Sequence, residues 1–374
     1  MCGIAGELRF DGRPSPADWK LISDLMYRRG PDDSGSWQDE HCNLVFRRLS
    51  ILDLSAAGHQ PMRSEDGRYV LVFNGEIYNF AGLRRQLEQR GVRFRSNSDS
   101  EVVLYSLAEW GRDALDRFNG MFALGFYDSR ERKLLLARDH AGIKPLYYLQ
   151  NPAGLMFGSQ YDQLLAHPWS EGLAYSRAAA ALYLQLASVP APYAILEITS
   201  MLEPGSWLEV NAEGHISQGC YYEFPRHQPA RLSGQEAMEA VDAAITAAVK
   251  RQLVSDVPIG AFLSGGVDSP LVCAKMQKVC DSRMRAFTIG TGGDRTDESQ
   301  DAIRYARELG IDQTVEHVAP DDALDMLDDV ITACGEPFGD FSIFPTLLVS
   351  RLARKNFTVM LSGDGGDELF WGYA

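Results

Sequence analysis

The sequence predicts two folded regions of different class, an α+β region built on antiparallel sheets and then an α/β region built on a doubly wound parallel sheet. Residues 1–210 contain short β-type runs separated by turns, with only two helical patterns between them, which is typical of antiparallel layers. From residue 234 to residue 374, helical and strand patterns alternate. This alternation indicates parallel strands joined by helical crossovers.

In the first region, the expected strands are the apolar runs at residues 69–75, 121–128, 133–139 and 155–159. Helical patterns cover residues 80–91 and 99–111, and each ends at a glycine, Gly91 or Gly111. The stretch 223–234, EFPRHQPARLSG, is polar and contains proline, as connections between domains commonly do. We therefore place a linker at residues 211–233.

The second region begins with an amphipathic helix at residues 234–253. Expected strands follow at residues 259–264, 284–290, 312–318 and 357–363, and further helices at 269–280 and 299–310. Since the strands recur with helices between them, we expect a parallel sheet covered by helices.

Composition narrows the classes of function. The net charge of −15 over 374 residues argues against general binding to nucleic acid or to anionic membranes, which needs clustered positive charge. The six cysteines include no CxxC pair, so neither a zinc site nor a disulfide framework is expected. The chain shows no membrane-spanning run and no secretory leader. We expect a cytoplasmic protein with reduced thiols that acts on small molecules.

A glycine-rich loop, FLSGGVDSP at residues 262–270, follows an expected strand and precedes an expected helix. In it, Ser264, Gly265 and Gly266 can bring successive backbone N–H groups close to an anion. The loop lacks the lysine of a Walker A motif. The alternative is a glycine-rich turn that binds no ligand.

A second loop, LSGDGGDELFWGY at residues 361–373, follows another expected strand. Ligands of open α/β sheets bind at the carboxyl ends of the strands, so both loops can meet at one nucleotide. Asp268 and Asp367 are then expected to hold Mg²⁺ against phosphate oxygens. The alternative is that these carboxylates only cap the helices that follow them.

These motifs resemble a known family. SGGVDS is similar to the pyrophosphate-binding PP-loop of ATP pyrophosphatases, and SGDGGDELF to the matching loop of glutamine-dependent asparagine synthetases. In that family the first half is a class II glutamine amidotransferase domain with an Ntn-hydrolase-like sandwich of antiparallel sheets. The resemblance there runs through CGIAG, RRGPDDSG, RLSILDLS, GHQPM, FNGEIYN, SDSEV, FNGMFALGFYD and ARDHAGIKPLYY.

The chemistry of such a domain explains a cysteine at position 2. Removal of Met1 would give Cys2 a free α-amine, whose reference pKa of ~7.7–8.0 allows it to accept the thiol proton near neutral pH. Attack on a carboxamide produces an oxyanion, for which the Asn74 side chain and the Gly75 N–H are expected donors. The alternative reading of the Asn-Gly pair is a hairpin turn.

The resemblance implies roles for further residues. Arg48 would pair with the α-carboxylate of glutamine, and Glu76 and Asp99 would recognise the rest of it; the alternatives are a surface cation for Arg48 and a helix cap for Asp99. In the second domain, Asp364 would take the acidic position associated with forming the acyl-adenylate. The implied ATP-binding residues are Phe262, Leu263, Ser264, Gly265, Gly266, Asp268, Ser269, Ile289, Ser362 and Gly363.

The resemblance implies an asparagine synthetase. Glutamine would be hydrolysed in the first domain, and ATP with Mg²⁺ would adenylate aspartate in the second, releasing AMP and pyrophosphate when ammonia attacks. Two alternatives stay open: the same chemistry on another carboxylate, such as a uronic acid or a peptide, and a glutaminase or regulatory module without synthesis. A homodimer also stays open.

The family continues beyond the second loop, whereas this sequence stops after LFWGYA. We therefore expect the second domain, residues 234–374, to be incomplete at its C-terminus, with Leu369, Phe370, Trp371 and Tyr373 uncovered. We also expect glutamine hydrolysis by this chain, with little ATP-dependent amide synthesis.

Overall fold

The chain, described here in a computed structural model, divides into two compact units. The first comprises Met1–Arg226 with Gly335–Gly339, and the second His227–Cys334 with Asp340–Ala374. The structure describes residues 1–226, 231–280, 282–291, 297–317, 324–340, 342–370 and 372. Across these residues, no helix has the length and apolar character needed to cross a membrane.

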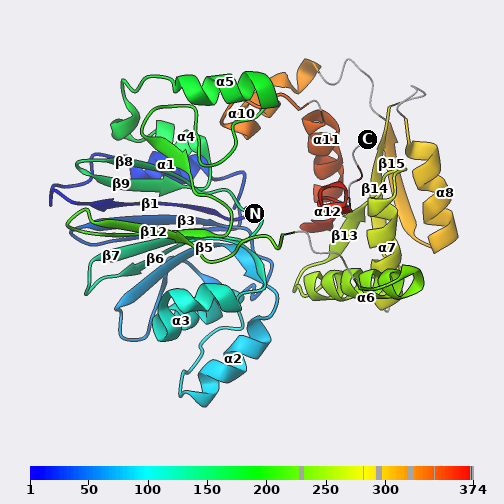
Figure 1. The fold of residues 1–374 in the computed structure, drawn as a ribbon, viewed down its shortest axis with the longest axis horizontal. Coiled ribbons are helices and arrows are strands. Elements are labelled where there is room, and N and C mark those ends of the chain that lie inside the picture. The colour runs from blue at the N-terminus through cyan, green and yellow to red at the C-terminus, as the bar shows by residue number, and fades with distance from the viewer. Residues whose placement is uncertain are drawn as a thin grey trace. The chain divides into compact units, whose positions relative to one another are not determined.

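The first unit contains two six-stranded sheets whose paired strands are antiparallel, and they lie face to face (Figure 1). In order across the first sheet, the strands are β10 (Thr199–Met201), β8 (Tyr147–Asn151), β9 (Gly154–Gly158), β1 (Gly3–Arg9), β3 (Cys42–Arg48) and β2 (Asp33–Gln38). Across the second they are β12 (Ile216–Cys220), β11 (Ser206–Asn211), β7 (Lys133–Arg138), β6 (Gly120–Asp128), β5 (Tyr69–Ile77) and β4 (Met62–Arg63).

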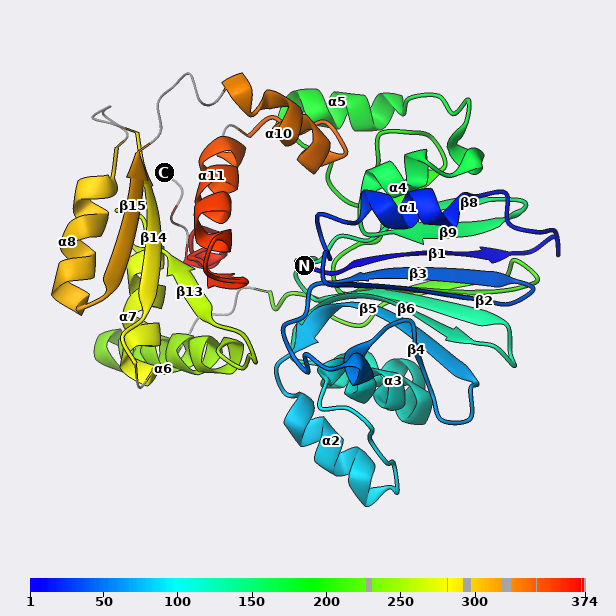
Figure 2. The same cartoon turned by 180° about the vertical axis from the view of Figure 1, so that it is seen from behind.

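Helices cover the outer faces of both sheets (Figures 1 and 2). Helices α2 (Phe80–Gln89) and α3 (Asp99–Trp110) pack on the second sheet, and α1 (Trp19–Leu25) and α4 (Tyr161–Leu165) on the first; α5 (Arg177–Leu186) follows α4. The strand period of two explains the layers. Along β5, Val70 and Val72 enter the core between the sheets, whereas Leu71 and Phe73 pack against the helices.

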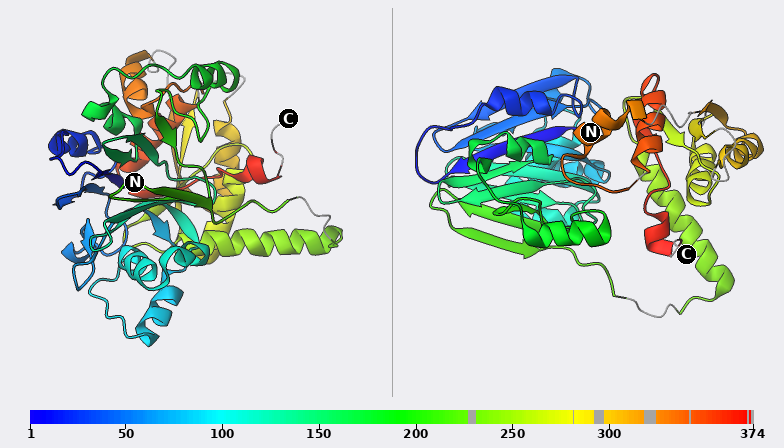
Figure 3. Two further views of the ribbon diagram at one scale, coloured as in Figure 1. Left: turned by 60° about the vertical axis from the view of Figure 1, so that its left-hand side comes forward. Right: turned by 90° about the horizontal axis from the view of Figure 1, so that it is seen from above.

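The second unit contains a four-stranded parallel sheet, and Figure 3 shows it with its helices from two further directions. Its strand order is β15 (Asp312–His317), β14 (Arg285–Gly290), β13 (Ile259–Phe262) and β16 (Val359–Leu361). The helices are α6 (Gly234–Gln252), α7 (Asp268–Val279), α8 (Ser299–Leu309), α10 (Leu327–Cys334), α11 (Ile343–Arg354) and α12 (Gly366–Phe370).

Helices lie on both faces of this parallel sheet. Ala286 packs in the core that contains residues of α6, α7 and α8, whereas its neighbour Phe287 packs against Leu352 of α11. Alternate residues of one strand therefore serve opposite faces. Together with the two antiparallel sheets of the first unit, this arrangement confirms the predicted fold class.

The borders of the units differ from the predicted ones in two places. The range 211–233, predicted as a linker, contains β12, which pairs with β11 at the edge of the second sheet. This strand reads ISQGC and is mostly exposed, so it lacks the apolar run that marks a strand in a sequence.

The second difference is a short insertion into the first unit. Gly335–Gly339 lie in the chain between α10 and α11 but belong to the first unit. There the Glu336 carboxylate accepts the backbone N–H of Ile195 at 2.8 Å and the phenol of Tyr147. The Gly339 N–H donates to the Ala187 carbonyl at 2.7 Å.

At the C-terminal end of the described chain, α12 spans only Gly366–Phe370, and both Leu369 and Phe370 are more than half exposed. Trp371 and Tyr373 lie outside the described residues.

Candidate active site

The thiol of Cys2 lies beside the end of β3. Because β1 and β3 are antiparallel with Gly3 opposite Arg47, the residue before β1 lies next to the residue after β3. The Cys2 sulfur accepts the Leu49 N–H at 3.4 Å and donates to the Leu49 carbonyl at 3.7 Å. Burial raises the pKa of this thiol, and the amino terminus and the Leu49 N–H oppose that rise.

Three alternate residues of β5 direct their backbone N–H groups away from β6. Gly75 faces Phe122 across the ladder, but Phe122 uses both its N–H and its carbonyl on Asp139. The N–H of Phe73 donates to Gln60 and that of Ile77 to Asp99. Gly75 lies between Phe73 and Ile77 in this alternating set, and no described residue accepts its N–H. This N–H is therefore available to a ligand.

Asn74 supplies a second unused donor. Its side chain is 1% exposed, and its Nδ2 atom has no hydrogen-bond partner among the described residues. A buried amide without a partner costs free energy, so this position is better explained by a ligand than by packing. The side chains of Asn74 and Val72 share one face of β5, the face toward the other sheet, where Cys2 also packs.

Two carboxylates lie close to these donors. Asp99, the first residue of α3, is 4% exposed, and burial raises its pKa to about 6. Burial, together with the charge of Asp99, also raises the pKa of Glu76 well above its ordinary value. A buried carboxylate beside a half-buried one favours a bound cation, which would let both ionise.

Arg48 has a structural task that the sequence did not predict. Its guanidinium donates to the carbonyls of Ser55 at 3.0 Å, Leu52 at 3.2 Å and Asp53 at 2.5 Å. These bonds fasten the loop after β3 next to Cys2. They use only part of the five-donor guanidinium fork, so Arg48 keeps capacity for a carboxylate.

The predicted residues of the first unit converge on one narrow cavity of about 30 Å³. Cys2, Arg48, Gly75, Glu76 and Asp99 all line it. Asn74 precedes Gly75 in β5 and is not among the lining residues. The cavity therefore brings together a thiol, the unused N–H of Gly75, two carboxylates and a guanidinium, and the unpartnered amide of Asn74 belongs to the residue next to Gly75.

Two cations near the cavity were not predicted. The Arg29 Nε donates to the Cys2 carbonyl at 2.9 Å, and Lys144 is 6% exposed, with its charge close to those of Glu76 and Cys2. Both residues stand within motifs of the family resemblance, RRGPDDSG and ARDHAGIKPLYY. Those motifs were the available signal.

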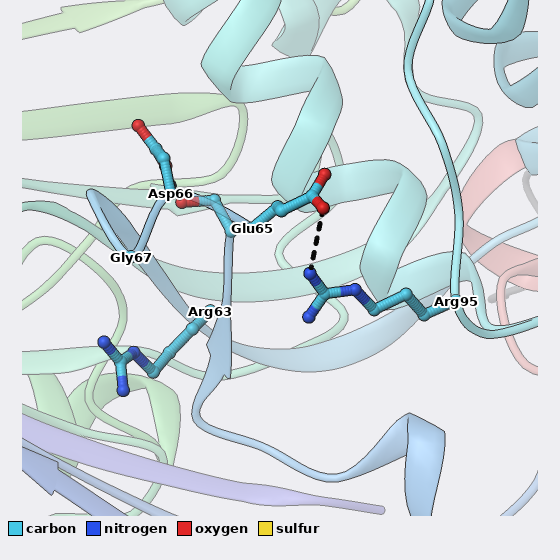
Figure 4. A pocket seen from close by; sticks show the side chains of 6 residues that line it. Arg63, Glu65, Asp66, Gly67 and Arg95 are labelled. Atoms are coloured by element: carbon cyan, nitrogen blue, oxygen red, sulfur yellow. Dashed lines mark hydrogen bonds and ion pairs between the residues drawn. The ribbon is translucent and has the colours of Figure 1, made fainter.

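A roomier hollow of about 380 Å³ lies elsewhere on the first unit (Figure 4). Arg63, Ser64, Glu65, Asp66, Gly67 and Arg95 line it, and Arg95 pairs with Glu65 at 3.6 Å. It is open to solvent, and the hydroxyl of Ser64 in it donates to the Asp66 carboxylate at 2.7 Å. The larger hollow is therefore not the one with the predicted catalytic residues. The chemistry favours the narrow cavity at Cys2.

In the second unit, the first glycine-rich loop satisfies its own N–H groups. The Ser264 N–H donates to the Ser269 hydroxyl at 2.8 Å, the Gly265 N–H to the Glu298 carboxylate at 3.1 Å and the Gly266 N–H to the Ser264 hydroxyl at 3.3 Å. The sequence predicted that these groups bind the phosphate of a ligand. In this structure all three are bonded within the chain, and the Glu298 carboxylate accepts the N–H of Gly265.

The two loops of the second unit meet, as the sequence predicted. A Cβ atom on Gly363 or Gly366 would collide with Asp268, so glycine is required where the loops touch. Gly366 is followed directly by Asp367. Asp268 begins α7 and Asp367 lies in the first turn of α12, so each follows a loop at the end of a parallel strand. Mg²⁺ prefers oxygen ligands of this kind and shares them with phosphates.

The remaining predicted nucleotide residues are divided between two faces. Phe262 and Ile289 pack together with Met360 on one face of the sheet, whereas Leu263 is buried in the core on the other. Both backbone groups of Leu263 are already bonded, to Phe287 and Thr288. In the second loop, the Ser362 hydroxyl donates to the Asp364 carboxylate at 2.8 Å.

Comparisons with known proteins also separate the chain into two regions. Residues 1–222 match the family described as glutamine amidotransferase domain, and residues 240–374 match asparagine synthase. Asparagine synthetase [glutamine-hydrolyzing] 1 of Bacillus subtilis is 33% identical over 377 residues, which cover 100% of this chain and 59% of the relative. Putative asparagine synthetase [glutamine-hydrolyzing] 2 of Methanocaldococcus jannaschii is 34% identical over 399 residues, which cover 100% of this chain and 76% of the relative.

A putative asparagine synthetase [glutamine-hydrolyzing] of Mycobacterium tuberculosis is 34% identical over 395 residues, which cover 100% of this chain and 60% of the relative. The chain thus spans about three fifths of two of these relatives and about three quarters of the other. Matches to both domain families and a 34% identical relative of which 76% is covered show that the chain belongs to the family of glutamine-hydrolysing asparagine synthetases.

Proposed function

We propose that the first unit hydrolyses glutamine to glutamate and ammonia at Cys2. The observation that carries the proposal is the pair of unused donors, the Asn74 amide and the Gly75 N–H, beside a thiol at the start of β1. Two donors without acceptors in a partly buried site suit a negative charge that forms only during reaction.

The proposed steps follow from this geometry. Once Met1 is removed, the α-amine of Cys2 takes the thiol proton and the sulfur attacks the amide carbon of glutamine. The Asn74 amide and the Gly75 N–H donate to the oxyanion. The C–N bond then breaks, ammonia leaves with the proton from the amine, and water cleaves the thioester to give glutamate and the free thiol.

Substrate recognition is proposed for the charged residues of the cavity. Glu76 and Asp99 would take the α-ammonium of glutamine, which lets both carboxylates ionise although burial opposes it. Arg48 would take the α-carboxylate with the donors that its loop carbonyls leave unused.

For the second unit we propose ATP-dependent activation of aspartate for amidation. Phe262 and Ile289 would contact the nucleoside, the loops at 264–269 and 362–364 would hold the phosphates, and Asp268 and Asp367 would hold Mg²⁺. The cation supplies charge neutralisation for the departing pyrophosphate. The contact between the two loops at Gly363 and Gly366 supports this assignment.

The test is a substrate panel on the purified chain. Glutamate release from glutamine is measured without ATP, for the chain and for Cys2→Ala. Pyrophosphate release is then measured with Mg-ATP and aspartate, a uronic acid or a carboxylate peptide. The pyrophosphate signal of this chain is expected to be small and to be largest with aspartate. A higher signal from another acid would reassign the acceptor, and no glutamate release would reject the glutaminase.

A further inference from the structure

In the loop between β7 and β8, an apolar residue is exposed and the lysine that follows it is buried. Ile143 is 53% exposed, whereas Lys144 is 6% exposed. Burying an ammonium is costly unless it is paired, and exposing isoleucine gains nothing. The loop therefore buries Lys144 and leaves Ile143 in solvent. This arrangement indicates that the charge of Lys144 has a role inside the protein.

The loop that carries Lys144 is held from both sides. The Asp139 carboxylate accepts the backbone N–H groups of Phe122, Ala141, Ile143 and Lys144 at 2.9–3.1 Å. The Arg138 guanidinium donates to the carbonyls of Lys144 at 2.9 Å, Leu202 at 2.6 Å and Gly142 at 2.7 Å. Both backbone groups of Lys144 are thus fixed, which limits where its side chain can reach.

The surroundings of the ammonium contain one carboxylate that needs a partner. Asp139 already accepts four backbone N–H groups, whereas Glu76 accepts no hydrogen bond from the described residues. Burial and Arg29 lower the pKa of Lys144, and Glu76, Asp139 and Cys2 oppose that fall. The charged or titratable groups around Glu76 and Cys2 are Arg29, Tyr78, Asp99, Asp139, Lys144 and the amino terminus.

Counting charges shows what the ammonium does. Glu76 and Asp99 bring two negative charges to the cavity, and the α-ammonium of a bound glutamine would neutralise one of them. The charges of Lys144 and of the amino terminus both act on Glu76, and the ammonium of Lys144 would neutralise the other negative charge. A nearby cation also favours the thiolate of Cys2 over the thiol.

We propose that Lys144 is a positioning residue for glutamine hydrolysis, whose buried ammonium keeps Glu76 ionised and favours the thiolate of Cys2. The role rests on the proposed glutaminase function of the first unit. Lys144 is not among the residues that line the cavity, so its proposed action is through Glu76 and Cys2.

The first test needs no turnover. Alkylation of Cys2 by iodoacetamide is followed against pH, with the modified peptide quantified by mass spectrometry so that the other cysteines do not interfere. Lys144→Met is expected to move the midpoint up by ~1 pH unit, the shift that a lost neighbouring charge produces. Lys144→Arg keeps the charge and is expected to restore the midpoint, and Lys20→Met, at an exposed lysine of α1, is expected to leave it unchanged.

The second test is the pH profile of kcat/KM for glutamine. Removing a cation raises the pKa of a neighbouring carboxylate, so the acid limb of Lys144→Met should move to higher pH, again with rescue by arginine. Lys144→Gln gives the same comparison if the methionine variant does not fold. Unchanged midpoints with only a lower melting temperature would assign Lys144 a structural role and overturn the proposal.

The two hypotheses fail separately. Wild-type chain that releases no glutamate at any pH would reject the glutaminase, while the alkylation profile would still report whether Lys144 controls the thiol. Normal glutaminase activity with alkylation midpoints that ignore Lys144 would reject the role of Lys144 alone.

Discussion

The Oδ2 atom of Asp99 accepts the backbone N–H of Ile77 at 2.8 Å, and this bond joins the first turn of α3 to the end of β5. It holds Asp99 beside Glu76 at the wall of the cavity. The same carboxylate therefore has a structural bond on one oxygen and a charge that burial disfavours. Burial favours the protonated form of Asp99, whereas the proposed binding of an ammonium group requires the ionised form.

This conflict predicts how Asp99→Asn responds to pH. In the folded chain the pKa of Asp99 rises from the model-peptide value of 3.8 to about 6, so the native state binds the proton more tightly than the unfolded state. The associated stability is present below about pH 4 and is lost as pH rises through 6. Asparagine can still accept the Ile77 N–H and carries no charge.

The melting temperature of Asp99→Asn relative to wild type should therefore be more favourable at pH 7.5 than at pH 4.5, while the KM for glutamine rises. Thermal unfolding at both pH values checks the first expectation and initial rates the second. An equal difference in melting temperature at the two pH values would show that Asp99 is ionised in the folded state without penalty.

Cys2→Ala should abolish glutamate release and labelling by a diazoketone analogue of glutamine, because the sulfur is the proposed nucleophile. Cys42→Ala is the matched control, since that thiol is fully buried and burial raises its pKa. Mass spectrometry of active protein should show that Met1 is absent. Fully active chain that retains Met1 would contradict the role of the α-amine.

Asn74→Ala and Arg48→Ala should separate in their kinetics. The Asn74 amide is needed mainly when the oxyanion forms, so its loss should lower kcat by ~10²-fold or more. Arg48→Ala should raise KM, because a carboxylate clamp binds ground and transition states alike. It should also lower the melting temperature, because Ser55, Leu52 and Asp53 lose their donor. Steady-state rates that showed the reverse pattern would exchange the two roles.

Asp268→Asn and Asp367→Asn should each weaken the binding of Mg-ATP with little change in side-chain size. Calorimetry with Mg-ATP, and with ATP in chelator, separates loss of the metal from loss of the nucleotide. Asp328→Asn, at an exposed position in the first turn of α10, is the control. Affinities equal to wild type in both loop variants would move the metal away from these carboxylates.

Much of the fold follows from local pattern. The strand predicted at 69–75 is β5 at Tyr69–Ile77, and the helix predicted at 80–91 is α2 at Phe80–Gln89, because alternation and periodicity are strong there. β12 was absorbed into the predicted linker because an exposed edge strand needs few apolar residues. The approach of Glu298 to Gly265 joins residues 33 positions apart, which no local pattern reveals.

The candidate site also has residues that local sequence motifs predict and residues whose place depends on the folded structure. Cys2, Arg48, Gly75, Glu76 and Asp99 were predicted through motifs, and they line one cavity. Lys144 was missed because a lysine in a loop is expected in solvent. Its burial depends on Arg138 and Asp139, which hold the loop on both sides, and such a contribution appears only in three dimensions.

The insertion at Gly335–Gly339 limits how this protein can be taken apart. A chain ended at Arg226 would contain both antiparallel sheets, yet the Ile195 N–H would lose its acceptor and the Tyr147 phenol its carboxylate. The first unit is therefore not continuous in sequence, since Gly335–Gly339 are encoded more than 100 residues downstream of Arg226. An exchange of this domain between relatives would have to transfer two separate stretches of sequence together. A fusion made at Arg226 alone would lack the carboxylate that accepts the Ile195 N–H and the Tyr147 phenol.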